Sequence, residues 1–428
     1  MTPPRAPRLV AGALTALVAA SAFAVLPVGS PPAFAADDCA PGNPQYSLDT
    51  PPALGLLQAE RAWTRGTGTG VLVAVVDSGI DAGNPHLQGA VVGGIDLVHD
   101  GEDPTGMTDV NGHGTAVAGQ IAARQISQSG VIGLAPDVDL LSVRVFRGTD
   151  GQSIDAGFGP TTARMSEGIR YAAAAHAAII TVSMSDFAAS GDLESAVTYA
   201  ESKGSLVVAS AGNRGTTEET SDSPRYPAAY PGALAVSATD ARGLVTDDSI
   251  HGQHVEVAAP GSQILTTATG AGDCIYAQEK PESSFATAYA SAAAALVAAA
   301  HPDETPAQWQ YRLMATGVRN NPDARNDLSG WGIVQPFDAI NLAPGADTRG
   351  PASPWTGTEG AVITPATATV TPNHTESPFA LTREATLIVS LGALTLFGTI
   401  AIIIVFRRRR SAANTAAAEP TRPGLLGS

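Results

Sequence analysis

The region from Asp37 to about Leu342 alternates short runs of β-branched residues with longer alanine-rich stretches. Val71–Val76 and Leu206–Ala209 are continuous apolar runs, a composition typical of strands that are buried on both faces. Residues 162–176 and 192–203 are long enough to form helices. This alternation predicts βαβ units, and therefore an α/β domain with a mostly parallel central sheet. Functional groups of such domains lie at the carboxyl ends of the strands.

The N-terminus has the features of a secretory signal peptide. Arg5 and Arg8 precede an apolar stretch from Leu9 to Val28. A small-residue cleavage site follows at Ala33–Ala35. We therefore expect residues 1–35 to be a signal peptide. The alternative is an uncleaved N-terminal anchor, and both interpretations export the domain that follows.

A second apolar segment lies near the C-terminus. Ala385–Phe406 contains 22 residues without a charge, which as a helix would rise about 33 Å and cross the core of a bilayer. Four arginines, Arg407–Arg410, follow at once, and such clusters mark the cytoplasmic side of a membrane span. The sequence predicts a transmembrane helix at 385–406 and a cytoplasmic tail at 407–428. A buried core helix is the alternative.

Charge and cysteine content exclude several functions. The chain has 24 Lys and Arg against 40 Asp and Glu, a formal net charge of -16, which argues against nucleic acid as a partner. The two cysteines, Cys39 and Cys274, cannot form a disulfide-rich scaffold or a four-cysteine zinc site. They can form one bridge outside the cytosol.

The remaining segments set the domain organisation. Residues 36–60 form an N-terminal extension, and residues 61–342 contain the strand and helix pattern. From residue 343 to residue 384 the composition shifts to Pro, Thr, Ala and Gly, which suits an extended linker between the domain and the membrane.

Three motifs carry candidate chemistry. Asp77 ends an apolar strand and is followed by a glycine turn, so we expect its carboxylate at a strand tip. His113 is flanked by glycines at the start of a small-residue helix. Ser284 lies at or near the N-terminus of an alanine-rich helix that runs to Ala300, where free amides favour developing negative charge.

Asp, His and Ser in this order on a parallel α/β scaffold resemble the subtilisin-like serine proteases, or subtilases. Three further motifs resemble family signatures: Ala209–Asn213, Tyr226–Pro231 and Val257–Gly261. The resemblance spans roughly residues 71–300. It implies a three-layer subtilisin-like fold and an endopeptidase that acts on protein or peptide substrates.

The signal peptide, the extension, the Ser-Phe-Ala variant at Ser284 and the C-terminal span resemble more closely the mycosins, membrane-anchored subtilases associated with type VII secretion. This resemblance implies limited proteolysis of secreted proteins and a structural part in the membrane secretion complex. Because Cys39 and Cys274 are the only cysteines of an exported chain, we predict a disulfide that ties the extension to the domain. Mycosins often have a cysteine where this chain has Val110, so that family bridge is not expected.

The resemblance also implies a role for each residue. Ser284 is the nucleophile, His113 the general base and later acid, and Asp77 the group that orients the imidazole. Asn213 and the backbone amide of Ser284 stabilise the oxyanion. The segment Thr181–Ser185 lines the substrate cleft, with Ser183, Met184 and Ser185 as the substrate-binding residues.

The chain departs from the family pattern at four positions. The family's Gly-Thr-Ser reads Glu282-Ser283-Ser284 here, Ala288 replaces a proline, and Ser185 replaces a glycine in the cleft. Glutamate brings bulk and a charge that opposes the oxyanion. We therefore expect a slow or selective protease, with an inactive one as the alternative.

Other polar residues receive structural interpretations, and we expect no metal and no cofactor. Asp100, Glu102 and Asp103 are interpreted as a solvated acidic loop rather than a calcium site. Asp81 is interpreted as a loop carboxylate near the triad of Asp77, His113 and Ser284. Asn373–Thr375 matches a glycosylation sequon, but a match of three residues is a weak indication of glycosylation. Seven histidines have no spacing typical of a zinc site: His86, His99, His176, His251, His254, His301 and His374.

Three functions remain open from the sequence. The first is an exported, membrane-anchored serine endopeptidase of the mycosin type. The second is a structural subunit of a secretion complex with low or no activity. The third is a generic cell-surface subtilase without a secretion partner.

Overall fold

The computed structural model describes residues 39, 42–216, 219–270, 272–357, 360 and 380–416. The signal peptide, half of the linker, the sequon at 373–375 and the last twelve residues lie outside this range. The chain divides into two units, residues 1–363 and residues 364–428, which are described separately.

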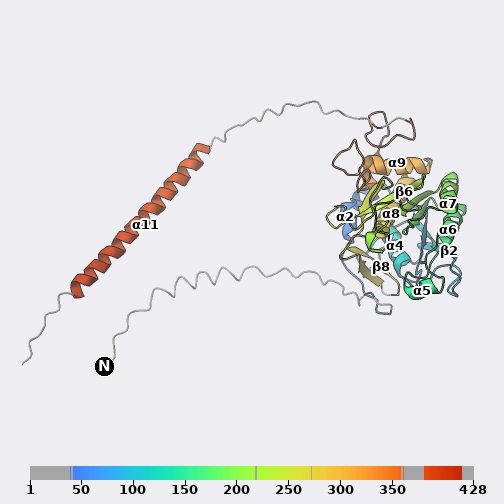
Figure 1. Ribbon diagram of the computed structural model, residues 1–428, viewed down its shortest axis with the longest axis horizontal. Helices are drawn as coiled ribbons and strands as arrows, with labels where there is room; N and C mark the ends of the chain where they lie inside the picture. Colours follow the sequence, from blue (N-terminus) through green and yellow to red (C-terminus); the bar gives the residue numbers. More distant parts are fainter. Residues whose placement is uncertain are drawn as a thin grey trace, which may run out of the picture. The chain divides into compact units, whose positions relative to one another are not determined.

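A seven-stranded sheet forms the centre of the first unit (Figure 1). Its spatial order is β2-β3-β1-β4-β5-β6-β7, and every neighbouring pair is parallel. The mostly parallel sheet expected from the sequence is confirmed. The strands are β1 (Leu72–Asp77), β2 (Val91–Asp96), β3 (Asp139–Arg144), β4 (Ile179–Val182), β5 (Leu206–Ser210), β6 (Ala233–Thr239) and β7 (Val257–Pro260).

Helices cover both faces of this sheet and give three layers. Successive β1 residues alternate between two cores: Val73 and Val75 belong to one, Ala74 and Val76 to the other. The second core contains α6 (Thr162–Ala174) and α7 (Gly191–Ser202), and the first contains α4 (His113–Ala122), α8 (Ser283–Ala300), α9 (Pro306–Thr316) and α10 (Pro336–Asn341). Shorter helices are α2 (Pro52–Leu56), α3 (Ala59–Trp63), α5 (Gly151–Asp155) and the 3-10 turn η2 (Arg214–Thr216).

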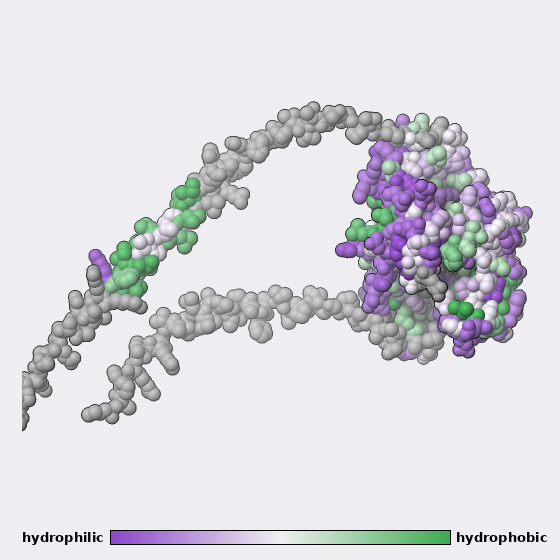
Figure 2. All heavy atoms as spheres, in the orientation of Figure 1, coloured by the Kyte–Doolittle hydropathy of each residue, from purple (hydrophilic) through white to green (hydrophobic). Residues whose placement is uncertain are grey.

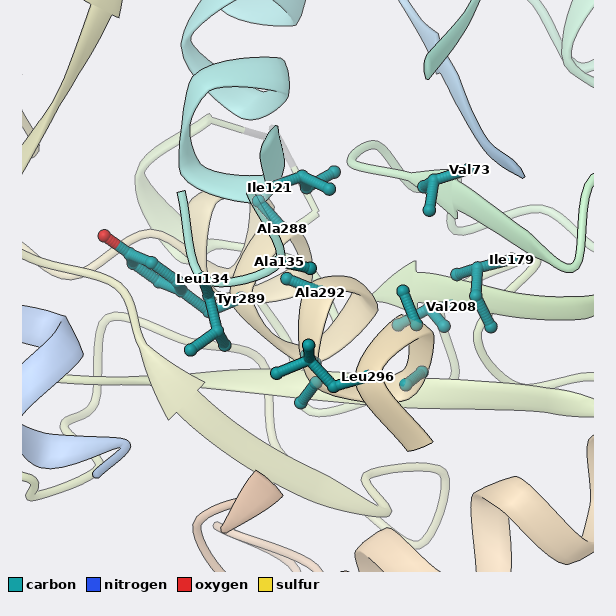
Figure 3. Close-up of a cluster of buried hydrophobic side chains, with 14 of the residues drawn as sticks. Val73, Ile121, Leu134, Ala135, Ile179, Val208, Ala288, Tyr289, Ala292 and Leu296 are labelled. Carbon is teal, nitrogen blue, oxygen red and sulfur yellow. The ribbon is translucent and has the colours of Figure 1, made fainter. Parts of the chain in front are cut away.

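Helix α8 is the centre of the first core. Its Ala288, Ala292 and Leu296 face strand residues that include Val73 and Val208, as Figure 3 shows. The small alanine side chains let this helix approach the sheet closely along its whole length. Its apolar composition therefore reflects burial in the domain, and 89% of it is buried.

The order of the strands brings the predicted site together. Strands β1, β4 and β5 are neighbours, so their carboxyl ends meet at one edge of the sheet. Asp77 ends β1, Ser183 follows β4, and Asn213 follows β5 after a short turn. This is the edge at which parallel sheets present functional groups.

An antiparallel hairpin outside the main sheet was not expected from the sequence. It consists of β8 (Ile264–Ala268) and β9 (Gly272–Tyr276). On β9, Cys274 forms a disulfide with Cys39 of the extension, with the two Cα atoms 5.5 Å apart. Asp273 is fully buried, and its Oδ2 accepts a hydrogen bond from the backbone of Ser47 at 2.9 Å. The extension is therefore held to the domain at this hairpin.

The first part of the predicted linker packs against the domain. Arg349 forms an ion pair with Asp323, with Nε and Oδ1 2.5 Å apart. The ring of Trp355 lies 5.5 Å from that of Tyr311 in an edge-on arrangement. Because these contacts order residues 343–357, this part of the segment is not an extended tether.

The second unit contains one described element, α11 (Ala380–Ala416). Its segment Ile388–Arg407 has a mean hydropathy of 2.5, and none of it is buried in protein. Figure 2 shows apolar residues along this segment. By length and composition this helix could cross a membrane. It begins before the predicted span at 385 and continues beyond the four arginines, since alanine and arginine are good helix formers.

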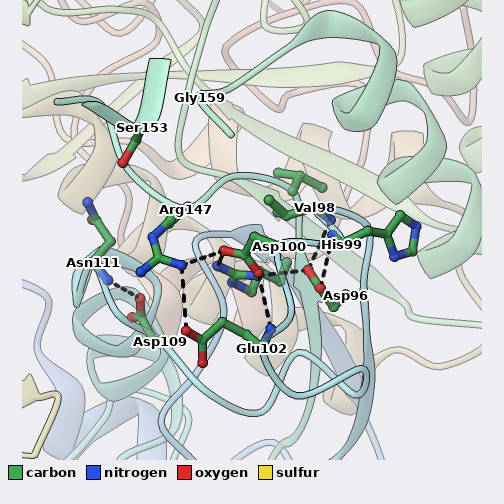
Figure 4. A network of polar contacts seen from close by, with 12 residues as sticks. Asp96, Val98, His99, Asp100, Glu102, Asp109, Asn111, Arg147, Ser153 and Gly159 are labelled. Carbon is green, nitrogen blue, oxygen red and sulfur yellow. Dashed lines mark hydrogen bonds and ion pairs between the residues drawn. The ribbon is translucent and has the colours of Figure 1, made fainter. Parts of the chain in front are cut away.

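The acidic segment after β2 is not a solvated loop, so that expectation is wrong for Asp100. Its side chain is fully buried and pairs with Arg144 at 2.7 Å and with Arg147 at 2.9 Å (Figure 4). These arginines hold the pKa of Asp100 well below its usual range, with the Arg144 hydrogen bond as the largest cause. Arg144 also pairs with Asp96 at 3.0 Å. Asp100 thus belongs to a buried ion-pair network, whereas Asp103 in the same segment is exposed.

We predict that Asp100→Asn lowers the free energy of unfolding by about 3 kcal/mol, because it leaves the buried Arg144 with an incomplete set of partners. Urea unfolding monitored by tryptophan fluorescence measures this. Asp103→Asn is the matched control: Asp103 lies in the same segment but is exposed, and we expect little change. Equal effects of the two substitutions would contradict the role assigned to the network.

Candidate active site

Asp77 lies buried at the carboxyl end of β1. Its Oδ1 accepts hydrogen bonds from the backbone amide of Ser78 at 2.8 Å and from Nδ1 of His113 at 2.8 Å. A carboxylate can only accept, so the proton of this second bond belongs to Nδ1. The contact therefore selects the tautomer in which Nε2 of His113 is free to take a proton.

Two glycines place His113 beside this carboxylate. Gly112, just before α4, has φ of 93°, a left-handed conformation that side chains rarely adopt. A Cβ on Gly114 would collide with the carbonyl oxygen of Gly79. The glycines flanking His113 therefore allow the amino end of α4 to approach β1. The histidine side chain remains 24% exposed.

Asp109 holds the same helix start and was not identified from the sequence. Its Oδ1 accepts from the amides of Asn111 and Gly112 at 3.0 and 2.8 Å. Its Oδ2 accepts from the amide and the hydroxyl of Thr115 at 2.9 and 2.7 Å. The only signal in the sequence is an Asp four residues before His113, ahead of the N-cap Gly112.

Ser284 is the second residue of α8, where backbone amides have no partner within the helix. Its side chain is 6% exposed and lines the same cavity as His113. The rings of His113 and the adjacent Phe285 have centroids 5.2 Å apart. In the part of the chain that the structure describes, no hydrogen bond joins Ser284 to His113. Such contacts often tighten only when substrate is bound.

The orientation of Asn213 follows from its contacts with Ser283. Its Oδ1 accepts from the amide of Ser283 at 2.7 Å and from its hydroxyl at 2.8 Å. An amide N–H can only donate, so the oxygen must face Ser283 and the NH2 group of Asn213 points away. Among the described residues nothing accepts from this NH2 group. Asn213 and Ser284 line the same cavity.

The cavity has a volume of about 480 Å³. The three predicted substrate-binding residues, Ser183, Met184 and Ser185, line it together with His113 and Ser284. Six other lining residues were not identified from the sequence: Phe146, Thr149, Pro160, Asp186, Phe187 and Arg225. Asp186 and Arg225 directly adjoin recognised motifs, but nothing in those motifs indicates that they line the cavity.

Glu282, which stands where the family has glycine, has an ordinary backbone conformation. Its φ of -122° and ψ of 127° are ordinary extended values, so no glycine is required by conformation. Its half-buried side chain instead lines the cavity. Burial raises the pKa of this carboxyl, and nearby His113 partly opposes that rise. The replacement of glycine therefore acts through the side chain.

The pKa of His113 is raised above its ordinary value by carboxylates. Burial, the largest single cause, lowers this pKa, but the charge and hydrogen bond of Asp77 and the charges of the other nearby carboxylates together outweigh it. Asp109 and Glu282 raise the pKa further through their charges. The imidazolium formed when His113 takes a proton is thus stabilised from several sides.

No group of three His, Cys, Asp or Glu side chains suited to a metal ion occurs in the described ranges. His86 is fully buried between Asp273 and the carbonyl oxygen of Arg124, with contacts of 3.0 and 2.7 Å. Asp81 accepts from the amides of Gly83 and Gly270 at 2.9 Å each. Asp81 therefore joins two loops and does not contact the triad residues, as its interpretation as a loop carboxylate predicted.

Residues 68–332 match the model of the subtilase family, peptidase family S8. The chain belongs to the subtilase family. Thermitase of Thermoactinomyces vulgaris is 41% identical over 211 residues, which cover 49% of this chain and 70% of that protein. Subtilisin E of Bacillus subtilis is 35% identical over 275 residues, 64% of this chain and 68% of that protein. The family and the serine endopeptidase class expected from the motifs are confirmed.

Solved structures similar to this subtilase include two mycosins. MycP1 of the ESX-1 type VII secretion system has a TM-score of 0.60 and 28% identity, with 72% of this chain and 90% of MycP1 covered. The MycP3 protease of the ESX-3 system has a TM-score of 0.59 and 28% identity, with 74% and 99% covered. The predicted subtilisin-like fold and the resemblance to mycosins are confirmed. The roles of individual residues stay predictions.

We predict that this subtilase loses activity as the pH falls through the raised pKa of His113, because the base must be neutral to accept a proton. Glu282→Gln removes one of the charges that raise this pKa, so the acid limb of log kcat/KM should move to lower pH. Asp186→Asn, in the same cavity, is the control and should leave the limb in place. An unchanged limb in the Glu282 variant would contradict the electrostatic argument.

We predict that Asn213→Asp lowers kcat about 10²- to 10³-fold with little change in KM, the range known for the corresponding asparagine of subtilisin. Aspartate keeps an oxygen toward Ser283 but has no NH2 group. Ser210→Ala is the control, because it removes the 2.7 Å contact with the hydroxyl of Ser283 and the 3.2 Å hydrogen bond from the amide of Gly212 but leaves Asn213 in place. Steady-state kinetics measure both. A similar loss in the two variants would assign Asn213 a structural role instead.

Proposed function

We propose that this chain is an exported, membrane-anchored serine endopeptidase of the mycosin type that acts through Asp77, His113 and Ser284. The proposal rests on the 2.8 Å hydrogen bond from His113 to the buried Asp77. His113 lines a cavity that Ser284 and Asn213 also line. These groups have the chemistry that acyl transfer requires.

The proposed reaction begins with attack by Oγ of Ser284 on the scissile carbonyl carbon. Nε2 of His113 takes the hydroxyl proton, and Asp77 stabilises the imidazolium without taking the proton itself. When the C–N bond breaks, His113 returns the proton to the leaving amine. Water, activated by the same imidazole, then hydrolyses the acyl-enzyme.

The negative oxygen of the tetrahedral intermediate requires donors that are already in place. The NH2 group of Asn213 is held in orientation by Ser283, and the amide of Ser284 lies in the first turn of α8. Both donate without a conformational change during the reaction, which is the source of their stabilising effect. The positive end of the α8 dipole acts in the same direction.

Membrane anchoring and a secretion partner belong to the same proposal. The apolar segment Ile388–Arg407 supports a single span, and the arginines at its end support a cytoplasmic tail with the protease domain outside. The similarity to MycP1 and MycP3, whose names place them in type VII secretion systems, supports subunits of such a system as partners.

A second candidate is a structural subunit of the secretion complex with little activity. Glu282 favours it, since a carboxylate in the cavity opposes the charge of the oxyanion. The two functions are compatible in one protein.

The test of the catalytic proposal is fluorophosphonate labelling of the full chain in detergent. We expect labelling of the wild type and none of Ser284→Ala. Ser291→Ala is the matched control, because Ser291 lies buried in the same helix outside the cavity. Absence of labelling in folded wild-type protein would remove the enzymatic proposal.

Complementation of a deletion strain separates the structural function from catalysis. Rescue of secretion by Ser284→Ala would support a structural subunit, and failure to rescue would show that catalysis is required. Normal secretion after deletion of the whole gene would remove the secretion partner from the proposal and favour a generic cell-surface subtilase.

A further inference from the structure

Glu282 is a carboxylate without a partner inside the substrate cavity. In the described part of the chain, its side chain forms no hydrogen bond and no ion pair, although it is half-buried. Partly buried carboxylates normally have such partners, because desolvation without compensation is unfavourable. Burial raises the pKa of Glu282 for the same reason, because desolvation disfavours the charged form of the carboxyl.

The backbone of Glu282 fixes where this carboxylate lies. Its amide donates to the carbonyl oxygen of Gly261 at 2.8 Å, and its own carbonyl oxygen accepts from Ala286 at 3.2 Å. Glu282 is also only two residues from Ser284. The side chain therefore projects into the cavity from a rigid position next to the proposed nucleophile.

The other charges of the cavity do not neutralise Glu282. The terminal nitrogens of Arg225 donate to backbone carbonyl oxygens, among them those of Glu219 at 2.7 Å and Ser223 at 3.1 Å. Asp186 is a second carboxylate in the lining, and its Oδ1 accepts from the amide of Ala188. With His113 neutral, the charged side chains of the lining are the two carboxylates Glu282 and Asp186 and the guanidinium of Arg225, an excess of one negative charge.

We propose that Glu282 selects substrates with a lysine or arginine side chain next to the scissile bond. The inference rests on the proposed function and assigns its substrate class. A cation placed against the half-buried Glu282 would form a charge-assisted hydrogen bond, which is stronger than one between neutral groups. Neutral and acidic side chains would leave the carboxylate unpaired.

The same pairing changes the rate of the chemical step. In the free enzyme the charge of Glu282 opposes the developing oxyanion and slows turnover of neutral substrates. A bound cation compensates this charge, so the penalty disappears only for the selected substrates. Selectivity should therefore appear in kcat as well as in KM, because the compensation acts on the transition state.

The experiment uses the full chain in detergent and internally quenched peptides at pH 8. Each of two peptide sets compares lysine, its neutral analogue norleucine, and glutamate at one position. The varied residue lies on the amino side of the cleaved bond in the first set and on the carboxyl side in the second. We expect lysine to exceed norleucine at least tenfold in kcat/KM in one set. In Glu282→Gln the ratio of kcat/KM for the lysine peptide to that for the norleucine peptide should fall below about threefold, mainly because the norleucine peptide is cleaved faster.

Three results would overturn the inference. The first is equal rates for the lysine and norleucine peptides in both sets. The second is a preference for glutamate, which would assign selection to Arg225. The third is a lysine preference that persists in Glu282→Gln. Asp186→Asn is the control for general charge effects and should retain most of the lysine preference. If Asp186→Asn abolishes the lysine preference as fully as Glu282→Gln does, the total negative charge of the cavity selects the substrate, and Glu282 has no specific role.

A binding measurement keeps this test separate from that of the proposed function. Ser284→Ala cannot turn over substrate, so fluorescence anisotropy with the same peptides reports selection alone. Tighter binding of the lysine peptide in Ser284→Ala, lost in the Ser284→Ala and Glu282→Gln double variant, supports the inference even if the wild type proves inactive. Equal binding of the three peptides in Ser284→Ala would overturn it.

Discussion

The hydrogen bond between Asp77 and His113 forms because the amino end of α4 meets the carboxyl end of β1 with no side chain between them. Gly114 permits that approach, and Asp109 holds the first turn of α4 in place through four hydrogen bonds. The tautomer of the imidazole, its raised pKa and its position in the cavity all follow from this contact. A change of a few tenths of an ångström at Gly114 would affect each of them.

The fold and most of the site could be predicted because their signals are local. Apolar runs identify the buried strands, and the residues around Asp77, His113 and Ser284 are contiguous motifs. The burial of Asp100 could not be predicted, because its partner Arg144 lies on another strand, 44 residues away. The orientation of Asn213 likewise depends on Ser283, 70 residues away. Hydrogen bonds and ion pairs across such separations have no signal in one sequence, unlike the Cys39–Cys274 disulfide, which joins the only two cysteines of the chain.

Glu282 links the departure from the family pattern to function. A glycine there would leave the cavity uncharged at that point and serve many substrates equally, whereas a carboxylate penalises the oxyanion and attracts cations. Its extended backbone shows that the exchange costs the fold nothing in conformation. The change from glycine to glutamate therefore lowers general activity and favours cationic substrates. Low activity on neutral peptides is then compatible with the presence of Asp77, His113 and Ser284.

The N-terminal extension acts on the same site from a distance. The hairpin that carries Cys274 also holds α4, because the hydroxyls of Thr266 and Thr267 donate to the carbonyl oxygens of Ala116 and Thr115 at 2.9 and 2.7 Å. No described residue of the extension lines the cavity. The described part of the extension thus supports the helix of His113 through the hairpin and does not line the cavity.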